Sequence, residues 1–371
     1  MKNKLIIDSV PLLFPLTGIG RYTYEIANLL EEQNHFNINY FYGYYSNNLI
    51  KQKKDKHSNL KSIILKSPYL KQLARKVLTI SSKFFAPKYD IYWQPNLIPK
   101  NGIKAKKIIT TVHDFSFILY ENYHPKERVN YINKYFYKNI IKSDYIITGS
   151  YYSKKEILQR LNFEEDKIKV IYHGVNHNLF KIYHNIKLNF QLPNKFILFV
   201  GSIEPRKNLI GLLKSYDLLS QKIKDEYKLV LIGFEGWNNN DILNLINKNK
   251  TNIHYLGFLE DIELAQIYNL ASLFVFPSFY EGFGLPVLEA MACGTPVLSS
   301  NKTSMPEICG DCAIYCNPNN IIDIKNKIEL ILSDVELQNN LIKKGLIKAS
   351  SYTWEKSMKE HLILFDKVLK N

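Results

Sequence analysis

The sequence predicts an α/β protein made of two Rossmann-like, doubly wound domains that face each other across a central cleft. Two observations support this fold class. Short apolar runs alternate with helical stretches in two series, and residues 181–194 separate the two series. Such alternation is typical of parallel sheets that helices cover on both faces. With 371 residues, the chain is long enough for each domain to bury its own core.

The first domain is predicted over residues 1–182. Its first strand covers residues 5–8, and a loop that contains Gly18 and Gly20 leads to a helix over residues 21–30. Later strands of this domain are expected at 108–112, 145–148 and 169–172.

The second domain is predicted over residues 190–350. It begins with an apolar strand at 196–200, typical of a buried parallel sheet. A helix is expected at 285–292, because Pro286 suits the first helical turn and Gly294 suits a helix end. Other strands are expected at 229–232, 273–276 and 297–298.

Two carboxylates flank a glycine-rich turn at the carboxyl end of the predicted strand 273–276. Glu281 begins the turn, and Glu289 lies in the helix that follows it. Ligands of open α/β sheets bind at this end of the strands, where helix amino ends present unpaired N–H groups to phosphate oxygens. Both carboxylates can accept hydrogen bonds from sugar hydroxyls. The alternative is that Glu289 only complements the helix dipole and Glu281 is a solvated loop charge.

Residues 277–297, together with 303–308, resemble the E-x7-E signature of the retaining glycosyltransferase family 4, whose members have the GT-B fold. The resemblance implies that Glu281 holds hydroxyls of a donor sugar and that Glu289 holds a ribose. It also implies that a terminal helix over 351–371 crosses back onto the first domain. In the family, backbone N–H groups of this turn contact the sugar and the phosphates, which here implicates Gly282, Phe283, Gly284 and Leu285.

A pair of adjacent cations follows the first strand of the second domain. Arg206 and Lys207 stand beside a helix amino end, which suits a diphosphate whose negative charge grows as it leaves. The alternative is a solvated pair. The segment 201–209 resembles the family's G-x-x-x-x-R/K-K-N element, but Ser202 stands where many relatives carry an arginine.

Other candidate residues come from the first domain and from residues 254–259. His113 follows a predicted strand, and the family's V-H-D histidine contacts the donor sugar, so we expect His113 to be essential for turnover. By the same resemblance, Gly18 and Gly20 belong to a glycine loop that faces the donor phosphates. Gly257 and Phe258 are placed like the family's base-binding loop, although an ordinary strand and turn would have the same sequence.

The sequence offers no obvious metal site. It contains no D-x-D motif and no histidine cluster, and its four cysteines are expected to be small packing residues. The GT-B resemblance implies metal-independent chemistry with no cofactor apart from the nucleotide-sugar substrate.

The net charge of +15 is concentrated in residues 51–88, which hold eleven bases and one acid. Residues 68–85 predict a basic amphipathic helix that either packs on its own domain or docks on the anionic inner leaflet of the cytoplasmic membrane. No nucleic-acid motif is present. Since neither a signal peptide nor a membrane-spanning run is seen, the sequence predicts a cytoplasmic protein that associates peripherally with the membrane.

Together these features predict transfer of a hexose from a nucleoside diphosphate sugar to a hydroxyl of a glycan or lipid-linked oligosaccharide in surface polysaccharide synthesis. Motifs of the first half look most like bacterial mannosyltransferases, which favours GDP-mannose as donor. A different UDP-, GDP- or dTDP-linked sugar remains open. So do a nucleotide-sugar epimerase or hydrolase with the same donor pocket, and a membrane-binding protein without activity.

Overall fold

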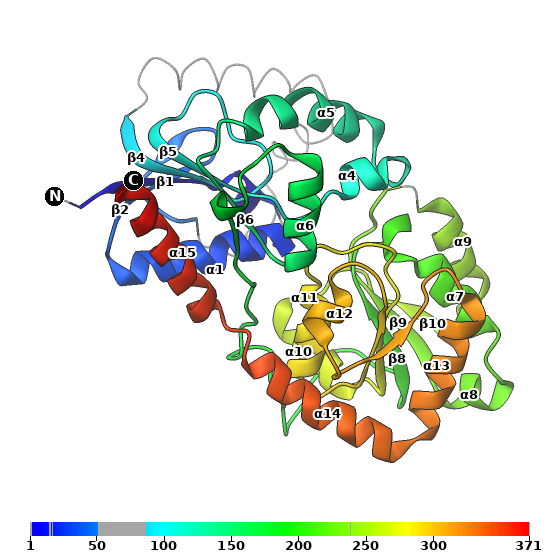
Figure 1. Ribbon diagram of the computed structural model, residues 1–371. Helices are drawn as coiled ribbons and strands as arrows, with labels where there is room; N and C mark the ends of the chain where they lie inside the picture. Colours follow the sequence, from blue (N-terminus) through cyan, green and yellow to red (C-terminus); the bar gives the residue numbers. More distant parts are fainter. Residues whose placement is uncertain (1, 15, 17, 51–86, 238, 371) are drawn as a thin grey trace.

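The computed structural model describes residues 2–14, 16, 18–50, 87–237 and 239–370, which form two α/β domains (Figure 1). The predicted basic helix 68–85 lies outside the described residues. Among those described, no helix combines the length and the apolar character that a membrane crossing requires. The two-domain α/β prediction is confirmed.

The first domain contains a seven-stranded sheet in the order β3-β2-β1-β4-β5-β6-β7. All of its neighbours run parallel except β2 and β3, which form an antiparallel pair. The strands are β1 (Lys4–Asp8), β2 (Asn37–Phe41), β3 (Tyr45–Ser46), β4 (Lys88–Gln94), β5 (Lys104–Thr111), β6 (Tyr145–Thr148) and β7 (Ile168–Val170).

The second domain contains a six-stranded, wholly parallel sheet in the order β10-β9-β8-β11-β12-β13. The order reverses between β8 and β11, which is the switch point where doubly wound sheets bind ligands. The strands are β8 (Phe196–Val200), β9 (Lys228–Ile232), β10 (Ile253–Tyr255), β11 (Leu273–Phe276), β12 (Val297–Ser300) and β13 (Ile314–Cys316).

Helices cover the sheets. Those of the first domain are η1 (Val10–Leu13), α1 (Gly18–Gln33), α4 (Ser116–Leu119), η2 (Glu121–Tyr123), α5 (Lys126–Ile140), α6 (Tyr151–Arg160) and η3 (Glu165–Lys167). Those that follow are η4 (Pro205–Lys207), α7 (Leu209–Asp217), α8 (Gln221–Glu226), α9 (Asn240–Lys248), α10 (Asp261–Leu270), α11 (Leu285–Ala292), α12 (Met305–Cys309), α13 (Ile321–Ser333), α14 (Val335–Ser350) and α15 (Trp354–Lys370).

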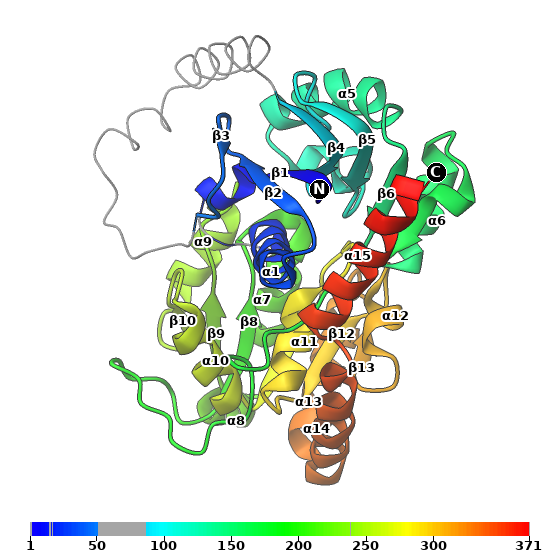
Figure 2. The same cartoon turned by 90° about the vertical axis from the view of Figure 1, so that its left-hand side faces the viewer.

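The last two helices belong to different domains. Helix α14 packs on α11 in the second domain, whereas α15 lies along α1 in the first (Figures 1 and 2). The amide of Val175 donates to the carbonyl oxygen of Tyr352, which ties the crossing point to the segment that links the two sheets. Nδ1 of the buried His361 ring in α15 donates to the carbonyl oxygen of Ser357, so its Nε2 accepts a hydrogen bond from the hydroxyl of Tyr22 in α1 at 2.6 Å.

One predicted boundary is wrong in a way that matters for the site. The helix predicted to begin at residue 21 begins at Gly18, so Gly18 and Gly20 lie in its first turns and not in a loop. The Thr23 hydroxyl donates to the Ile19 carbonyl oxygen, four residues earlier, which is a contact of continuous helix. Gly20 is buried, and a Cβ there would lie 3.3 Å from Cδ2 of Leu16 and 3.5 Å from the carbonyl oxygen of Pro11.

Candidate active site

Three of the predicted residues form one buried ionic cluster at the carboxyl ends of β8 and β11. The ammonium of Lys207 lies 2.6 Å from Oε1 of Glu281, and a guanidinium nitrogen of Arg206 lies 3.2 Å from Oε2. Glu281 is only 7% exposed. Burial alone would raise the pKa of Glu281, but the charges of Lys207 and Arg206 outweigh it and hold the pKa below its ordinary value. Glu281 is therefore ionised at neutral pH.

Sequence reasoning missed Glu204, which completes this cluster. Its carboxylate lies 2.6 Å from a second guanidinium nitrogen of Arg206 and is 2% exposed. Arg206 also donates to the carbonyl oxygen of Tyr280 at 2.7 Å. Two carboxylates and one carbonyl thus fix the guanidinium, while its Nε is buried without a hydrogen-bond partner among the described residues. An arginine held in this way is preorganised to meet an anion.

The turn after β11 touches the first domain so closely that it requires glycine. A Cβ added to Gly282 would lie 2.1 Å from the carbonyl oxygen of His113. The Gly282 carbonyl accepts hydrogen bonds from the hydroxyls of Ser150, the N-cap residue of α6, at 2.8 Å and of Ser153 in that helix at 3.3 Å. These contacts hold the turn of residues 281–284 against the end of β5.

The same turn opens α11 with free backbone donors. Gly284 is the N-cap residue and adopts a φ of 96°, which favours glycine. No hydrogen-bond partner within the described residues is recorded for the amides of Gly282, Phe283, Gly284 and Leu285. Unpaired N–H groups at a helix start are suited to phosphate oxygens or sugar hydroxyls. A Cβ on Gly18 would come within 4.0 Å of Leu285, so α1 begins beside this turn.

His113 lies at the end of β5, with its ring among aromatic side chains. Its Nε2 is 2.8 Å from the carbonyl oxygen of Pro95, so Nε2 carries the proton and donates. The rings of Tyr22 and His173 lie 5.1 and 5.5 Å away. Burial lowers the pKa of His113, which keeps the ring neutral at physiological pH. Its Nδ1 lone pair is then available as a hydrogen-bond acceptor.

Glu289 belongs to a second network that joins the two domains. Its Oε1 lies 3.9 Å from Nε of Arg21, and its Oε2 accepts a hydrogen bond from Tyr268 at 3.4 Å. Arg21, from α1, also binds both carboxylate oxygens of Asp261, the first residue of α10. Burial raises the pKa of Glu289 to about 6, although the charge of Arg21 opposes this shift. Sequence reasoning missed both Arg21 and Asp261.

Gly257 and Phe258 follow β10, and Gly257 is joined to the end of β9. Gly257 has a φ of 70° and accepts a hydrogen bond from the Gly233 amide at 2.8 Å. The ring of Phe258 is stacked 4.2 Å from that of Phe234 and is 48% exposed. An exposed stacked aromatic pair is suited to receive a flat base.

The described residues contain no group of three or more His, Cys, Asp or Glu side chains placed to hold a metal ion. The four cysteines are unpaired and buried, as expected for packing residues.

Comparison with known proteins identifies the family. Residues 16–179 match the family described as Glycosyltransferase Family 4, and residues 182–347 match Glycosyl transferases group 1. O-antigen chain mannosyltransferase B of Escherichia coli is 32% identical over 372 residues, covering 95% of this chain and 96% of that protein. The chain belongs to glycosyltransferase family 4.

Another relative is O-antigen chain mannosyltransferase RfbU of Salmonella typhimurium, which is 30% identical over 218 residues, or 56% of each protein. Two solved structures show the GT-B fold of this glycosyltransferase. Sucrose-phosphate synthase from Thermosynechococcus elongatus matches with a TM-score of 0.73 at 18% identity, over 100% of both chains. WaaG, a glycosyltransferase involved in lipopolysaccharide biosynthesis, matches with a TM-score of 0.71 at 12% identity, over 98% and 99% of the two chains.

Proposed function

We propose that this glycosyltransferase transfers a mannosyl residue from GDP-mannose, with retention and without a metal ion, to a hydroxyl of a glycan or lipid-linked oligosaccharide in surface polysaccharide synthesis. The observation that carries the proposal is the buried cluster of Arg206, Lys207 and Glu281 beside the end of β5. The choice of mannose is supported by the 32% identity to O-antigen chain mannosyltransferase B over almost the whole chain.

Donor binding would rearrange the cluster. The diphosphate meets Arg206, Lys207 and the free amides at the start of α11, so Glu281 is released from part of its ion pairing and accepts hydrogen bonds from sugar hydroxyls. Glu289 accepts from the ribose. His113 contributes a neutral ring whose Nδ1 accepts a hydrogen bond from the sugar.

The reaction needs no covalent enzyme intermediate. The acceptor oxygen forms a bond to the anomeric carbon on the face that the diphosphate leaves, while the bond from that carbon to the phosphate oxygen breaks. The leaving diphosphate takes the acceptor's proton, and Arg206 with Lys207 stabilises the negative charge that develops. Close contact between the turn at Gly282 and His113 excludes water that would otherwise compete as acceptor.

A thermal-shift screen of GDP-, UDP- and dTDP-sugars tests the donor, because a ligand that binds only the folded state raises the melting temperature. We expect GDP-mannose to give the largest shift. Nuclear magnetic resonance of the glycoside product then reports the anomeric configuration, which we expect to match that of the donor. A sugar released or epimerised at full rate without acceptor would instead indicate a hydrolase or epimerase.

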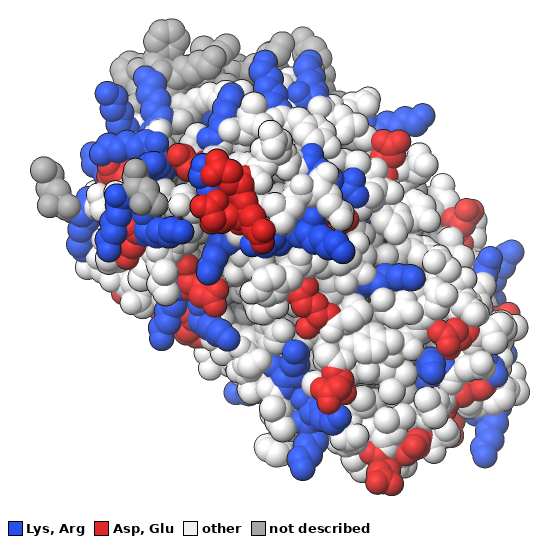
Figure 3. Space-filling view, in the orientation of Figure 1, with Lys and Arg blue, Asp and Glu red and all other residues white. Residues whose placement is uncertain are grey.

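We also propose that the protein works in the cytoplasm, at the inner face of the membrane. Residues 68–85 contain Lys71, Arg75, Lys76 and Lys83, and Figure 3 shows further Lys and Arg side chains gathered over the first domain. Each such charge contributes about 1 kcal/mol near an anionic surface. Neutralising these four residues is expected to abolish sedimentation with phosphatidylglycerol vesicles. Unchanged sedimentation would contradict membrane docking through this segment.

A further inference from the structure

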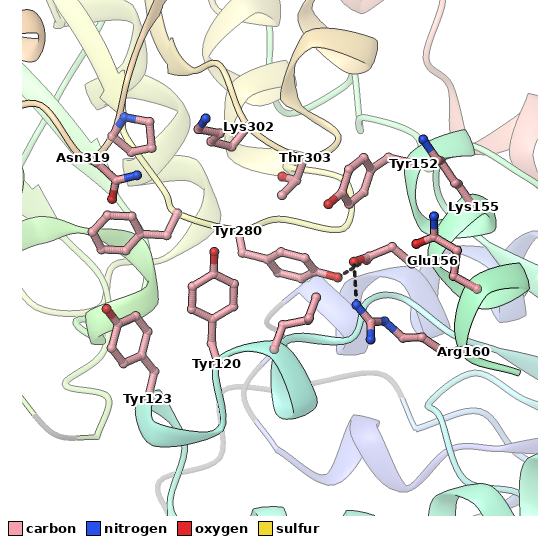
Figure 4. Close-up of a pocket in the computed structure, with 14 residues that line it drawn as sticks. Tyr120, Tyr123, Tyr152, Lys155, Glu156, Arg160, Tyr280, Lys302, Thr303 and Asn319 are labelled. Carbon is pink, nitrogen blue, oxygen red and sulfur yellow. Dashed lines mark hydrogen bonds and ion pairs between the residues drawn. The ribbon is translucent and has the colours of Figure 1, made fainter.

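A cavity of about 570 Å³ opens between the domains, next to Tyr280 at the start of the turn after β11 (Figure 4). The first domain lines it with α4, η2 and α6, and the second domain with the segments that follow β11, β12 and β13. Its volume falls within the range of small-molecule sites, about 300–1,000 Å³. None of the residues predicted from sequence lines it.

The cavity and the ionic cluster share one short stretch of backbone. The side chain of Tyr280 lines the cavity, while its carbonyl oxygen accepts a hydrogen bond from Arg206 at 2.7 Å. The next residue is Glu281, whose amide donates to the hydroxyl of Thr303, another lining residue, at 3.1 Å. A ligand in the cavity would therefore lie next to the proposed donor site.

The lining is rich in aromatic rings that combine an apolar face with a polar edge. Tyr120 and Tyr280 have their centroids 5.5 Å apart, and Tyr123 and Phe279 lie 6.2 Å apart. Tyr152 lies on the α6 side, with Asn319 on the opposite wall (Figure 4). Such rings pack against the C–H faces of a sugar while their hydroxyls and a nearby amide hydrogen bond to its edge.

The cavity also carries an excess of positive charge. Glu156 accepts a hydrogen bond from Tyr280 and pairs with Arg160 at 3.8 Å, so the charges of this carboxylate and this guanidinium offset each other. Lys155 and Lys302 are exposed and have no carboxylate partner within the described residues. Two unpaired ammonium groups on opposite domains remain for a ligand.

We propose that this cavity is an acceptor subsite for an anionic saccharide, whose sugar packs on the tyrosines and whose phosphate or carboxylate lies between Lys155 and Lys302. The inference rests on the proposed glycosyltransfer, since it assigns the cavity to the acceptor of that reaction. The anion could belong to a glycosyl phosphate linkage or to a uronic acid, and the experiment separates these two sources.

The test compares Lys155→Ala/Lys302→Ala with the control Lys138→Ala/Lys343→Ala, which removes one exposed, unpaired lysine from each domain outside the cavity. Three acceptor probes are used: α-mannobiose, mannobiose 1-phosphate and a glucuronate-containing disaccharide. For each anionic probe that the wild type binds, the cavity variant should raise KM about tenfold. The KM for GDP-mannose and for neutral mannobiose should change by less than about twofold in either variant.

Ligand-observed saturation-transfer spectra give a second readout that does not require turnover. The wild type should transfer saturation to at least one anionic probe. Tyr152→Ala should weaken the transfer to that probe and to mannobiose. If no probe is glycosylated but the lysine variant still loses the anionic probe, the proposed function fails and the subsite stands. The subsite would be overturned if the wild type transferred saturation to neither anionic probe. Equal losses of saturation transfer in the cavity and control variants would also overturn it.

Discussion

The guanidinium of Arg21 binds both carboxylate oxygens of Asp261, at 2.9 and 2.6 Å, and thereby joins α1 of the first domain to α10 of the second. The pair is 240 residues apart in sequence. Because the Nε of the same arginine also lies 3.9 Å from Glu289, the contact between the domains is coupled to the carboxylate that we assign to the ribose. Donor binding and domain closure should therefore influence each other.

This coupling predicts opposite pH effects of two substitutions. Ionised Glu289 is the better acceptor for ribose hydroxyls, and its pKa is raised to about 6, so kcat/KM for the donor should fall as the pH drops below about 6. Arg21 lowers this pKa and Asp261 raises it. In profiles of kcat/KM against pH, Arg21→Met should move the midpoint of the acid limb to higher pH. Asp261→Asn should move that midpoint to lower pH.

Glu289→Gln serves as the control for this prediction, because it removes the titrating group and should flatten the acid limb. Shifts in the same direction for both variants would contradict the coupling.

The raised pKa of Glu289 also has a consequence for folding: the protonated carboxyl favours the folded state below pH 4.5, and that contribution is lost as the pH rises through about 6.

Replacement of the central carboxylate should separate nucleotide binding from turnover. Glu281→Gln leaves Arg206 and Lys207 without their shared buried partner, which should lower the melting temperature of the free protein. A diphosphate can then replace the lost charge, so GDP should stabilise the variant at least as much as the wild type. Transfer should nevertheless slow about a hundredfold, because the sugar has lost an ionised acceptor. A variant that loses GDP binding in titration calorimetry would contradict this role.

Alanine substitutions at two glycines test the close contact between the turn at Gly282 and the end of β5. Gly282→Ala places a Cβ 2.1 Å from the carbonyl oxygen of His113 and should force the turn away from β5, with loss of transfer and a lower melting temperature. Gly18→Ala meets only a side-chain atom of Leu285 at 4.0 Å, and helix propensity favours alanine there. The second variant should melt at or above the wild-type temperature. Calorimetry that ranks the two variants equally would argue against the close contact.

Chelation should leave the reaction unaffected. In the proposal, Arg206, Lys207 and the amides at the start of α11 supply the positive charge that a divalent ion would otherwise provide. Initial rates measured in an excess of EDTA should equal those without it. Restoration of a lost rate by Mn²⁺ or Mg²⁺ would show that these groups are insufficient.

Much of the fold could be predicted from sequence because parallel strands that are buried on both faces are continuous apolar runs. The strands β6, β8 and β11 and the helix α11 begin and end at the predicted residues. Strand β4 was missed because Lys88–Gln94 mixes charged and aromatic residues, and its burial depends on neighbours on both sides. Helix α1 begins early because tertiary packing holds two glycines that local propensity would place in a loop.

The site was predictable where its residues lie in short motifs at strand ends. Arg206, Lys207 and Glu281 were expected together, and the structure places both cations within 3.2 Å of the Glu281 carboxylate. Arg21 and Asp261 could not be found in the same way, because a single sequence does not show which distant charges meet. Glu204 lies two residues before Arg206, and its role depends on a side-chain direction that the motif does not reveal. The roles of His113, Gly257 and Phe258 in donor binding stay predictions.

A crystal structure of the complex with GDP-mannose, or with the nucleotide sugar that gives the largest thermal shift, tests the central claim most directly. We predict diphosphate oxygens within hydrogen-bond distance of Arg206 and Lys207, sugar hydroxyls on Glu281 and the ribose on Glu289. A nucleotide sugar bound elsewhere, with the ion pairs from Glu281 to Lys207 and Arg206 unchanged, would contradict the account.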